Sequence, residues 1–185
     1  GGGKLCRVWQ EAGRALGVGK TEELNWIGIK TTHANAEVVR TMLGSDAHKE
    51  VVLNPKQKVA KFKILIGAGY EPGHSTDYDA VVRAKTLGSK TVLNLSDVQY
   101  VYDKDPGQYK DAKPLRTLSW KQFFKIIGTK DFSPGMNTPF DPTAAKFAAR
   151  HGIGVVFMRG KDVKNFERFL QGKKFSGTII GDLDI

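Results

Sequence analysis

Apolar residues recur along this chain with two spacings, one typical of helices and the other of strands. From Leu5 to Leu16 they fall every three or four positions, which predicts an amphipathic helix that ends at Gly17. The same spacing predicts helices at residues 24–43, 77–87, 118–127, 141–150 and 163–170. Asp141 and Pro142 mark one of these starts clearly, because Asp caps a helix and Pro suits its first position.

Short runs of apolar and β-branched residues between these helices predict strands. The strongest run, residues 62–66, is expected to be a buried strand. Further strands are expected at residues 51–53, 91–95, 153–158 and 178–180. Strands that alternate with helices favour an α/β fold, here a three-layer αβα sandwich with a largely parallel central sheet. No internal repeat or low-complexity linker divides the sequence, so we expect one domain over residues 1–185.

Composition and cysteine content narrow the class of protein. Of the 185 residues, 40% are hydrophobic and 26% charged, which is ordinary for a globular domain. No apolar run approaches the roughly 18 residues that a membrane span needs, and the N-terminus lacks the pattern of a secretory signal. The single cysteine, Cys6, excludes an internal disulfide and suits a reducing compartment. We therefore expect a cytoplasmic protein with no membrane partner.

The net charge of +10 is the one unusual total, and it is typical of proteins that bind nucleic acids, acidic membranes or anionic small ligands. The 29 Lys and Arg residues are scattered along the chain, with no run longer than two. No nucleic-acid motif with interleaved aromatic residues accompanies them, so no nucleic-acid partner is expected. The four His and one Cys show no zinc spacing, so no metal site built from protein side chains is expected either.

Two glycine-rich turns precede predicted helices and are candidate phosphate sites. Residues 69–77 read GYEPGHSTD, with Ser75 or Thr76 available to cap the helix that follows. Such a turn directs backbone N–H groups and the positive end of the helix dipole at one point, where an anion is favoured. Residues 1–3, GGG, lead into the first helix in the same way. Two such cradles favour two phosphorylated ligands; an expression scar at the N-terminus and a plain connection at 69–76 stay open as alternatives.

The order and spacing of these segments resemble the uridylate (UMP) kinases of the amino-acid-kinase superfamily, most closely the archaeal type. The resemblance covers essentially the whole chain. It rests on GGG followed by Arg7, LNWIGI at 24–29, THANA at 32–36, the 69–77 turn, SDVQYVYDKDP at 96–106 and the helix start at 141–146.

The resemblance implies a nucleoside monophosphate kinase that transfers a phosphoryl group from ATP to UMP in pyrimidine nucleotide biosynthesis, with Mg²⁺. It implies a homo-oligomer, a hexamer in this family, and catalytic roles for Arg7 and Asp77. UMP would be bound by Gly2, Asn25, Gly69, Tyr70, Glu71, Pro72, Gly73, His74, Ser75 and Thr76. ATP would be bound by Gly3, Arg7, Ser96, Asp97, Tyr102 and Asp105. No general base is needed, because the second pKa of a phosphate monoester is about 6 and UMP is already mostly dianionic at pH 7.

The chain also departs from the family pattern. Asn25 stands in place of an Asp, His33 in place of an Arg, and Gln99 and Tyr100 in place of an Asp-Gly pair. The family places a strand, a K-x-S-G phosphate loop, a helix and a second strand ahead of the three glycines. We therefore expect an N-terminally incomplete domain without its first βαβ portion, and kinase activity provided that the full protein has this loop. A related carboxylate or carbamate kinase and a non-catalytic nucleotide-binding subunit stay open as alternatives.

Overall fold

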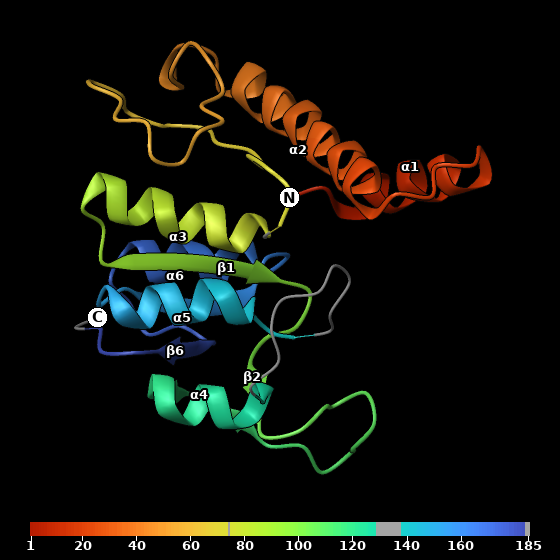
Figure 1. Ribbon diagram of the computed structural model, residues 1–185. Coiled ribbons are helices and arrows are strands. Elements are labelled where there is room, and N and C mark those ends of the chain that lie inside the picture. The colour runs from red at the N-terminus through yellow and green to blue at the C-terminus, as the bar shows by residue number, and fades with distance from the viewer. Residues whose placement is uncertain (74, 129–137, 184–185) are drawn as a thin grey trace. The chain divides into compact units, whose positions relative to one another are not determined.

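The computed structural model describes residues 1–73, 75–128 and 138–183 (Figure 1). The chain forms two compact units, Gly1–Thr86 and Leu87–Ile185. No helix in the described ranges is long and apolar enough to cross a membrane.

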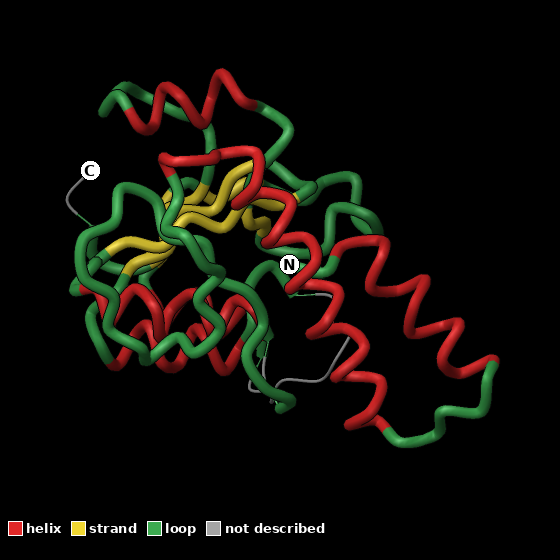
Figure 2. Tube along the Cα trace, turned by 90° about the horizontal axis from the view of Figure 1, so that it is seen from above, coloured by secondary structure: helices red, strands yellow, loops and turns green. Residues whose placement is uncertain are grey.

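The first unit opens with two packed helices, α1 (Gly3–Ala15) and α2 (Thr21–Leu43), which lie side by side in Figure 2. Both helices are confirmed where the apolar spacing predicted them. Small residues permit their close approach: a Cβ on Gly13 would lie 2.9 Å from the Cδ1 of Ile27, and one on Gly28 would lie 3.0 Å from the Sγ of Cys6. After a short 3₁₀ turn, Gly44–Asp46, an irregular stretch leads to α3 (Thr76–Leu87), which is also confirmed.

The strands expected at 51–53 and 62–66 are wrong. In the described part of the chain these residues form only isolated parallel bridges, Ala47 with Ile64 and Val52 with Gly67. Two hydrogen bonds hold the first bridge, from the His48 N–H to the Ile64 carbonyl at 2.8 Å and from the Ile64 N–H to the Asp46 carbonyl at 3.2 Å. At the second bridge the Val52 N–H donates to the Ile66 carbonyl at 2.9 Å. Lysines flank Phe62, whose side chain is 37% exposed, so the run is not the buried strand that its apolar content suggested. A segment paired at single points gains too few ladder hydrogen bonds to form a strand.

The second unit is built on a four-stranded sheet in the order β1-β5-β6-β4. The strands are β1 (Thr91–Ser96), β4 (Thr117–Leu118), β5 (Gly154–Arg159) and β6 (Thr178–Ile180). β1 pairs with β5 and β4 with β6 in parallel, whereas β5 and β6 are antiparallel. The expected α/β fold with a largely parallel sheet is confirmed. A separate antiparallel pair, β2 (Val101–Tyr102) and β3 (Pro114–Leu115), carries the polar loop between them.

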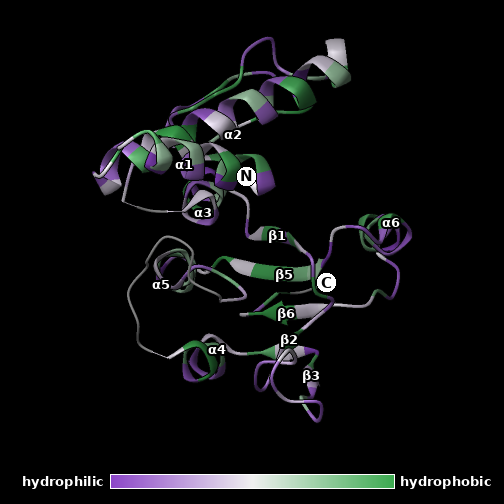
Figure 3. Cartoon of the chain, turned by 90° about the vertical axis from the view of Figure 1, so that its right-hand side faces the viewer, coloured by the Kyte–Doolittle hydropathy of each residue, from purple (hydrophilic) through white to green (hydrophobic). Residues whose placement is uncertain are grey.

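Helices cover both faces of this sheet. In Figure 3, α4 (Trp120–Ile127) and α5 (Pro142–Arg150) lie on one side of the strands and α6 (Val163–Leu170) lies on the other. The core between these layers is fully closed to solvent at Phe123, Val155 and Phe157, because β5 is buried on both faces. β1 pairs with this buried strand along its whole length, from Thr91 to Ser96. The pairing fixes the carboxyl end of β1, where the loop of residues 97–100 begins.

Helix starts in the second unit follow their capping residues. The side chain of Asp141 accepts a hydrogen bond from the Thr143 N–H at 2.6 Å, as expected for an N-cap. The helix expected at 118–127 begins only at Trp120, since Ser119 and Gln122 form a capping box ahead of it. Leu118 belongs instead to β4, a strand too short to show any alternation of apolar residues.

Candidate functional site

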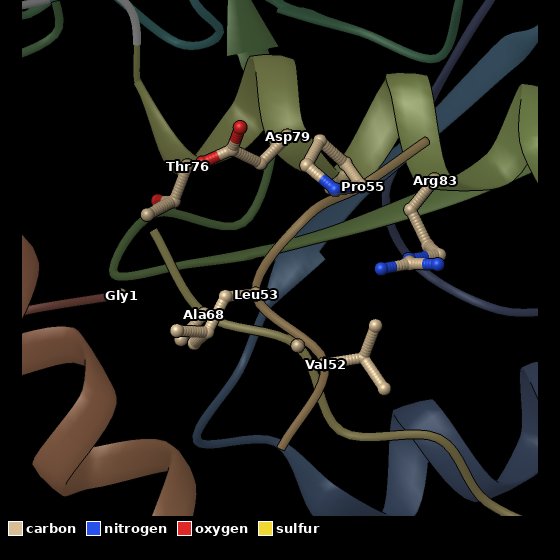
Figure 4. Close-up of a pocket in the computed structure, with 10 residues that line it drawn as sticks. Gly1, Val52, Leu53, Pro55, Ala68, Thr76, Asp79 and Arg83 are labelled. Atoms are coloured by element: carbon tan, nitrogen blue, oxygen red, sulfur yellow. The ribbon is translucent and has the colours of Figure 1, made fainter. Parts of the chain in front are cut away.

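The two glycine-rich segments of the first unit come together in space. Gly1 lies beside the start of α3, so close that a Cβ on Gly1 would lie 3.7 Å from the Thr76 hydroxyl oxygen. Both residues border a hollow of about 350 Å³, here called the Gly1 hollow (Figure 4). It is lined by Gly1, Val52, Leu53, Pro55, Gly67, Ala68, Thr76, Asp79, Ala80 and Arg83.

The start of α3 is capped by Ser75. The Ser75 hydroxyl and carbonyl oxygens both accept the Tyr78 N–H, at 3.3 Å and 3.1 Å. Of the two candidate caps in the sequence, Ser75 therefore fills this role, and the hydroxyl of Thr76 is left at the edge of the hollow. Gly73, in the turn before the helix, has a φ of +103°, which only glycine adopts without strain. The helix start thus points N–H groups toward a turn that can accommodate an anion.

Helix α2 holds the second glycine segment through Thr32 and His33. The Thr32 hydroxyl accepts the Gly69 N–H at 2.8 Å and donates to the Ile29 carbonyl at 2.7 Å. The Nε2 of His33 lies 2.8 Å from the Gly69 carbonyl, so this nitrogen carries a hydrogen and donates it. Both backbone groups of Gly69 are therefore fixed by neighbouring side chains of one helix. His33, which replaces an Arg in the family pattern, has a structural partner here.

The N-terminal glycines are held from the same helix by Asn35. Its side-chain amide donates to the carbonyl of Gly1 at 2.9 Å and to that of Gly2 at 3.4 Å. Gly2 has no room for a side chain, because a Cβ there would lie 2.4 Å from the Cβ of Cys6. The Asn35 amide and the packing of Gly2 against Cys6 thus fix the backbone of residues 1–2.

Charged residues on α3 fix the backbone around the Gly1 hollow (Figure 4). Asp79 is 7% exposed, and its Oδ2 accepts the Tyr70 N–H at 3.1 Å. The guanidinium of Arg83 donates to the carbonyls of Asn54 and Gln57, each at 2.6 Å. Burial lowers the pKa of Arg83 from its ordinary value, and the nearby Asp79 carboxylate opposes this shift. These two side chains therefore connect the 69–73 turn and the 54–57 turn to α3.

Other residues predicted for the site do not line this hollow. Arg7 is exposed on α1, one turn beyond the glycines, and Asn25 is half-buried near the start of α2. Asp77 is half-buried in the first turn of α3. Glu71 is exposed, whereas Pro72 is half-buried. His74 lies outside the described residues.

A second hollow, of about 590 Å³, lies in the second unit beyond the carboxyl end of β1 and is here called the Tyr102 hollow. It is lined by Ser96, Asp97, Val98, Tyr100, Tyr102, Lys104, Asp105, Pro106, Gly107, Ile126, Ile127, Thr138 and Pro139. Four residues predicted to bind ATP are brought together here, namely Ser96, Asp97, Tyr102 and Asp105. Gly3 and Arg7, also predicted for ATP, belong to the first unit.

The polar groups of the Tyr102 hollow are partly held by their own loops. One carboxylate oxygen of Asp105 accepts the Gly107 N–H at 2.8 Å, which closes a turn. Lys104 bonds to Asp111 at 2.6 Å, so its charge is directed along the loop. Together with Ile126 and Ile127, which add apolar lining, these polar groups suit a ligand with a flat apolar part and a few polar groups.

Comparisons with known proteins show which family the chain belongs to. The model of the amino acid kinase family matches residues 19–159. The chain belongs to the amino acid kinase family. It is 32% identical to a uridylate kinase of Methanobrevibacter smithii over 183 residues, 97% of this chain and 81% of that protein. A uridylate kinase of Staphylothermus marinus is also 32% identical, over 97% of this chain and 81% of its own.

Solved structures of uridylate kinases share the fold of this amino acid kinase. The crystal structure of a uridylate kinase from Archaeoglobus fulgidus superimposes with a TM-score of 0.82 at 28% identity, covering 98% of this chain and 82% of the other. The UMP kinase structure from Bacillus anthracis, at 22% identity and a TM-score of 0.73, covers 94% and 75% and supports the fold. The resemblance that the sequence motifs indicated is confirmed.

Residues that hold the glycine segments of this kinase were missed as functional residues in the sequence. Thr32, His33 and Asn35 belong to the THANA segment, which was noted for its resemblance but given no role. Thr32 and Asn35 lie three positions apart and so share one face of the helix, but this spacing does not show which backbone groups they contact. Asp79 and Arg83 are likewise four residues apart on α3, but nothing in the local sequence shows which distant backbone groups they meet.

Replacing Thr32 with valine is expected to release the Gly69 amide. The substitution keeps the shape of the side chain but removes the acceptor. A lost hydrogen bond of about 1 kcal/mol corresponds to a roughly fivefold larger equilibrium constant for local opening, and so to faster exchange. Amide hydrogen exchange measured at Gly69 tests this. Thr31 provides a matched control on the same helix, because it is equally buried and its hydroxyl bonds only to the Ile27 carbonyl. Equal protection of Gly69 in both variants would contradict the role of Thr32.

Proposed function

We propose that this amino acid kinase transfers the γ-phosphoryl group of ATP to UMP, which gives UDP and ADP in pyrimidine nucleotide biosynthesis. The observation that carries the proposal is the meeting of Gly1 with the capped start of α3, where Asn35 of α2 also holds the Gly1 carbonyl. Backbone N–H groups and a helix N-terminus at one point form a phosphate site that needs no charged side chain. The uridylate kinases among the relatives support UMP as the acceptor.

In this proposal UMP occupies the first unit. Its phosphate lies against the N–H groups of the N-terminal glycines, Gly2 among them, and the start of α3 at Ser75 and Thr76. The turn from Gly69 to Gly73 surrounds the nucleoside, with Tyr70, Glu71, Pro72 and His74 as the remaining contacts. Asn25 hydrogen-bonds the ribose through its amide, which keeps the donor and acceptor groups for a hydroxyl but lacks the charge of the family's Asp.

ATP, in the same proposal, occupies the Tyr102 hollow of the second unit. Its base lies near Tyr102 and its ribose near Asp105, whose second carboxylate oxygen is not the one that closes the turn with Gly107. Ser96 and Asp97 lie at the end of β1, where ligands bind in sheets of this kind. Gly3 and Arg7 are proposed to meet the ATP phosphates.

The chemical step needs positive charge rather than a base. The UMP phosphate is an anion that attacks another anion, so the barrier is lowered by positioning and by electrostatic stabilisation. Arg7 is exposed on α1, one turn beyond the glycines, and we propose that it neutralises charge as the phosphoryl group moves. Asp77, in the first turn of α3, is proposed to orient the water molecules around the reacting phosphates.

Magnesium is proposed to enter with ATP. The described residues contain no group of three or more His, Cys, Asp or Glu side chains that could hold a metal by themselves. In kinases Mg²⁺ is bound mainly by phosphate oxygens and water, with one or two carboxylates. Asp77 and Asp105 offer such oxygens. When bound, the ion neutralises phosphate charge.

We further propose that the two units form one amino acid kinase domain, which works in the cytoplasm as a homo-oligomer, with the hexamer of the family as the expected size. An exposed apolar strip on α1 supports an oligomer, since Leu5, Val8 and Trp9 are 46%, 57% and 55% exposed.

An ADP-release assay with a panel of acceptors tests the proposed activity. With ATP and Mg²⁺, turnover is expected for UMP and not for acetylglutamate or carbamate, and chelation of the metal by EDTA should abolish it because the phosphate charges are then unscreened. Turnover of acetylglutamate without turnover of UMP would overturn the assignment of the acceptor. Calorimetric binding of both nucleotides without any turnover would point instead to a non-catalytic subunit.

A further inference from the structure

An arginine and two tyrosines form a connected group at the wall of the Tyr102 hollow. The rings of Tyr100 and Tyr102 meet edge to face, with centroids 6.4 Å apart and planes at 89°. The guanidinium carbon of Arg116 lies 5.6 Å from the centroid of the Tyr100 ring. Both tyrosines line the hollow, whereas Arg116 does not.

The backbone on both sides of Tyr100 is fixed. The Gln99 side chain donates to the Ser176 carbonyl at 2.7 Å, and the Val101 N–H donates to the Thr178 hydroxyl at 2.9 Å. Val101 and Thr178 are both fully buried. The ring of Tyr100 therefore projects from a rigid point of the second unit, so its place at the wall costs little conformational entropy on binding.

We propose that Tyr100 determines the base specificity of the phosphoryl donor, by offering a purine base an aromatic stacking surface at the wall of the hollow. Arg116 is a positioning residue in this arrangement, because it contacts the ring and holds its orientation through a cation–π interaction. The inference rests on the proposed function in one respect, the placement of ATP in the Tyr102 hollow. The hollow of about 590 Å³ is in the range of small-ligand sites.

Stacking of a base on an aromatic side chain predicts a selective loss of affinity. Tyr100→Leu keeps an apolar side chain but removes the ring, and should weaken ATP binding roughly tenfold. CTP, with its smaller ring, should lose less, and inorganic tripolyphosphate, which has no base, should bind as before. Tyr100→Phe retains the ring and should bind all three as the unaltered protein does. Isothermal titration calorimetry with the three ligands in the presence of Mg²⁺ measures these differences.

Arg116→Met tests the positioning role and provides a second variant whose change is on the surface. It should weaken ATP binding about threefold, without effect on tripolyphosphate, because Arg116 acts through the ring. In the Tyr100→Leu background the same change should have no further effect. A loss of tripolyphosphate affinity in Arg116→Met would mean that Arg116 binds phosphate directly, and would overturn the proposal.

These measurements separate the inference from the proposed function. Equal weakening of ATP, CTP and tripolyphosphate by Tyr100→Leu, or no weakening of ATP, would overturn the role of Tyr100 even if UMP is phosphorylated normally. A base-selective loss in a protein that phosphorylates no acceptor would support Tyr100 and refute the proposed reaction. If ATP does not bind to the unaltered protein, the role of Tyr100 and the proposed reaction are both refuted.

Discussion

Replacing Arg7 with alanine is expected to lower kcat for phosphoryl transfer to UMP by about 100-fold or more, with little change in Tm. Arginines that stabilise charge during phosphoryl transfer contribute factors of about 10³ or more, and single donors to a developing anion about 10². Arg7 is exposed on α1, and no hydrogen bond or ion pair holds its side chain within the described residues. Its removal should therefore lower kcat and leave the folded state intact. Steady-state kinetics and thermal unfolding of the variant measure the two effects.

Arg14→Ala is the matched control for this change. Arg14 is also exposed and lies seven residues later on α1, on nearly the same face but two turns farther from the glycines. Its replacement should leave kcat within about twofold, because charges on the surface beyond a Debye length of about 10 Å are largely screened. Turnover by the Arg7 variant at the unaltered rate would remove Arg7 from the catalytic step, and an equal loss in both variants would reduce its role to general surface charge.

The elements that sequence reasoning predicted well are those whose local signals agree. Residues 163–170 and 178–180 form a helix and a strand with the expected bounds, α6 and β6. In α5 the capping Asp141 and the following Pro142 mark the start, and Gly152 with a φ of +60° follows its end. Residues 62–66 had an equally apolar composition, but whether such a run becomes a strand depends on neighbours that pair along its length, which no local pattern reveals.

In the candidate site, too, features formed by consecutive residues could be predicted, whereas contacts between residues far apart in the sequence could not. The glycine turns and a cap at Ser75 or Thr76 could be predicted because a turn at a helix start is a property of consecutive residues. The bonds from Thr32 to Gly69 and from Asn35 to Gly1 join residues 37 and 34 positions apart. Only the folded chain brings these groups together, so their role could be inferred from the sequence only through resemblance, and not from spacing or propensity.

Replacing Asp79 with alanine is expected to lower the free energy of unfolding by about 2 kcal/mol and to raise the KM for UMP roughly tenfold, with a smaller change in kcat. The carboxylate is almost fully buried and accepts the Tyr70 N–H, and a buried donor left without its partner costs about 1–3 kcal/mol. Its charge also favours the protonated form of Arg83, which holds the 54–57 turn. Chemical denaturation and steady-state kinetics with varied UMP measure both effects.

Two further variants distinguish a role in the 69–73 turn from a general loss of stability. Asp79→Asn keeps an oxygen that can accept the Tyr70 N–H but lacks the charge, so it should retain most of the affinity for UMP. Asp162→Ala removes a carboxylate that accepts the Asn165 N–H at the start of α6, and should lower stability without raising the KM. If Asp162→Ala raised the KM for UMP as much as Asp79→Ala, the effect would follow stability alone. If the KM for UMP rises only in Asp79→Ala, the effect is due to the lost hydrogen bond to Tyr70. The 69–73 turn must then be held in place before UMP binds.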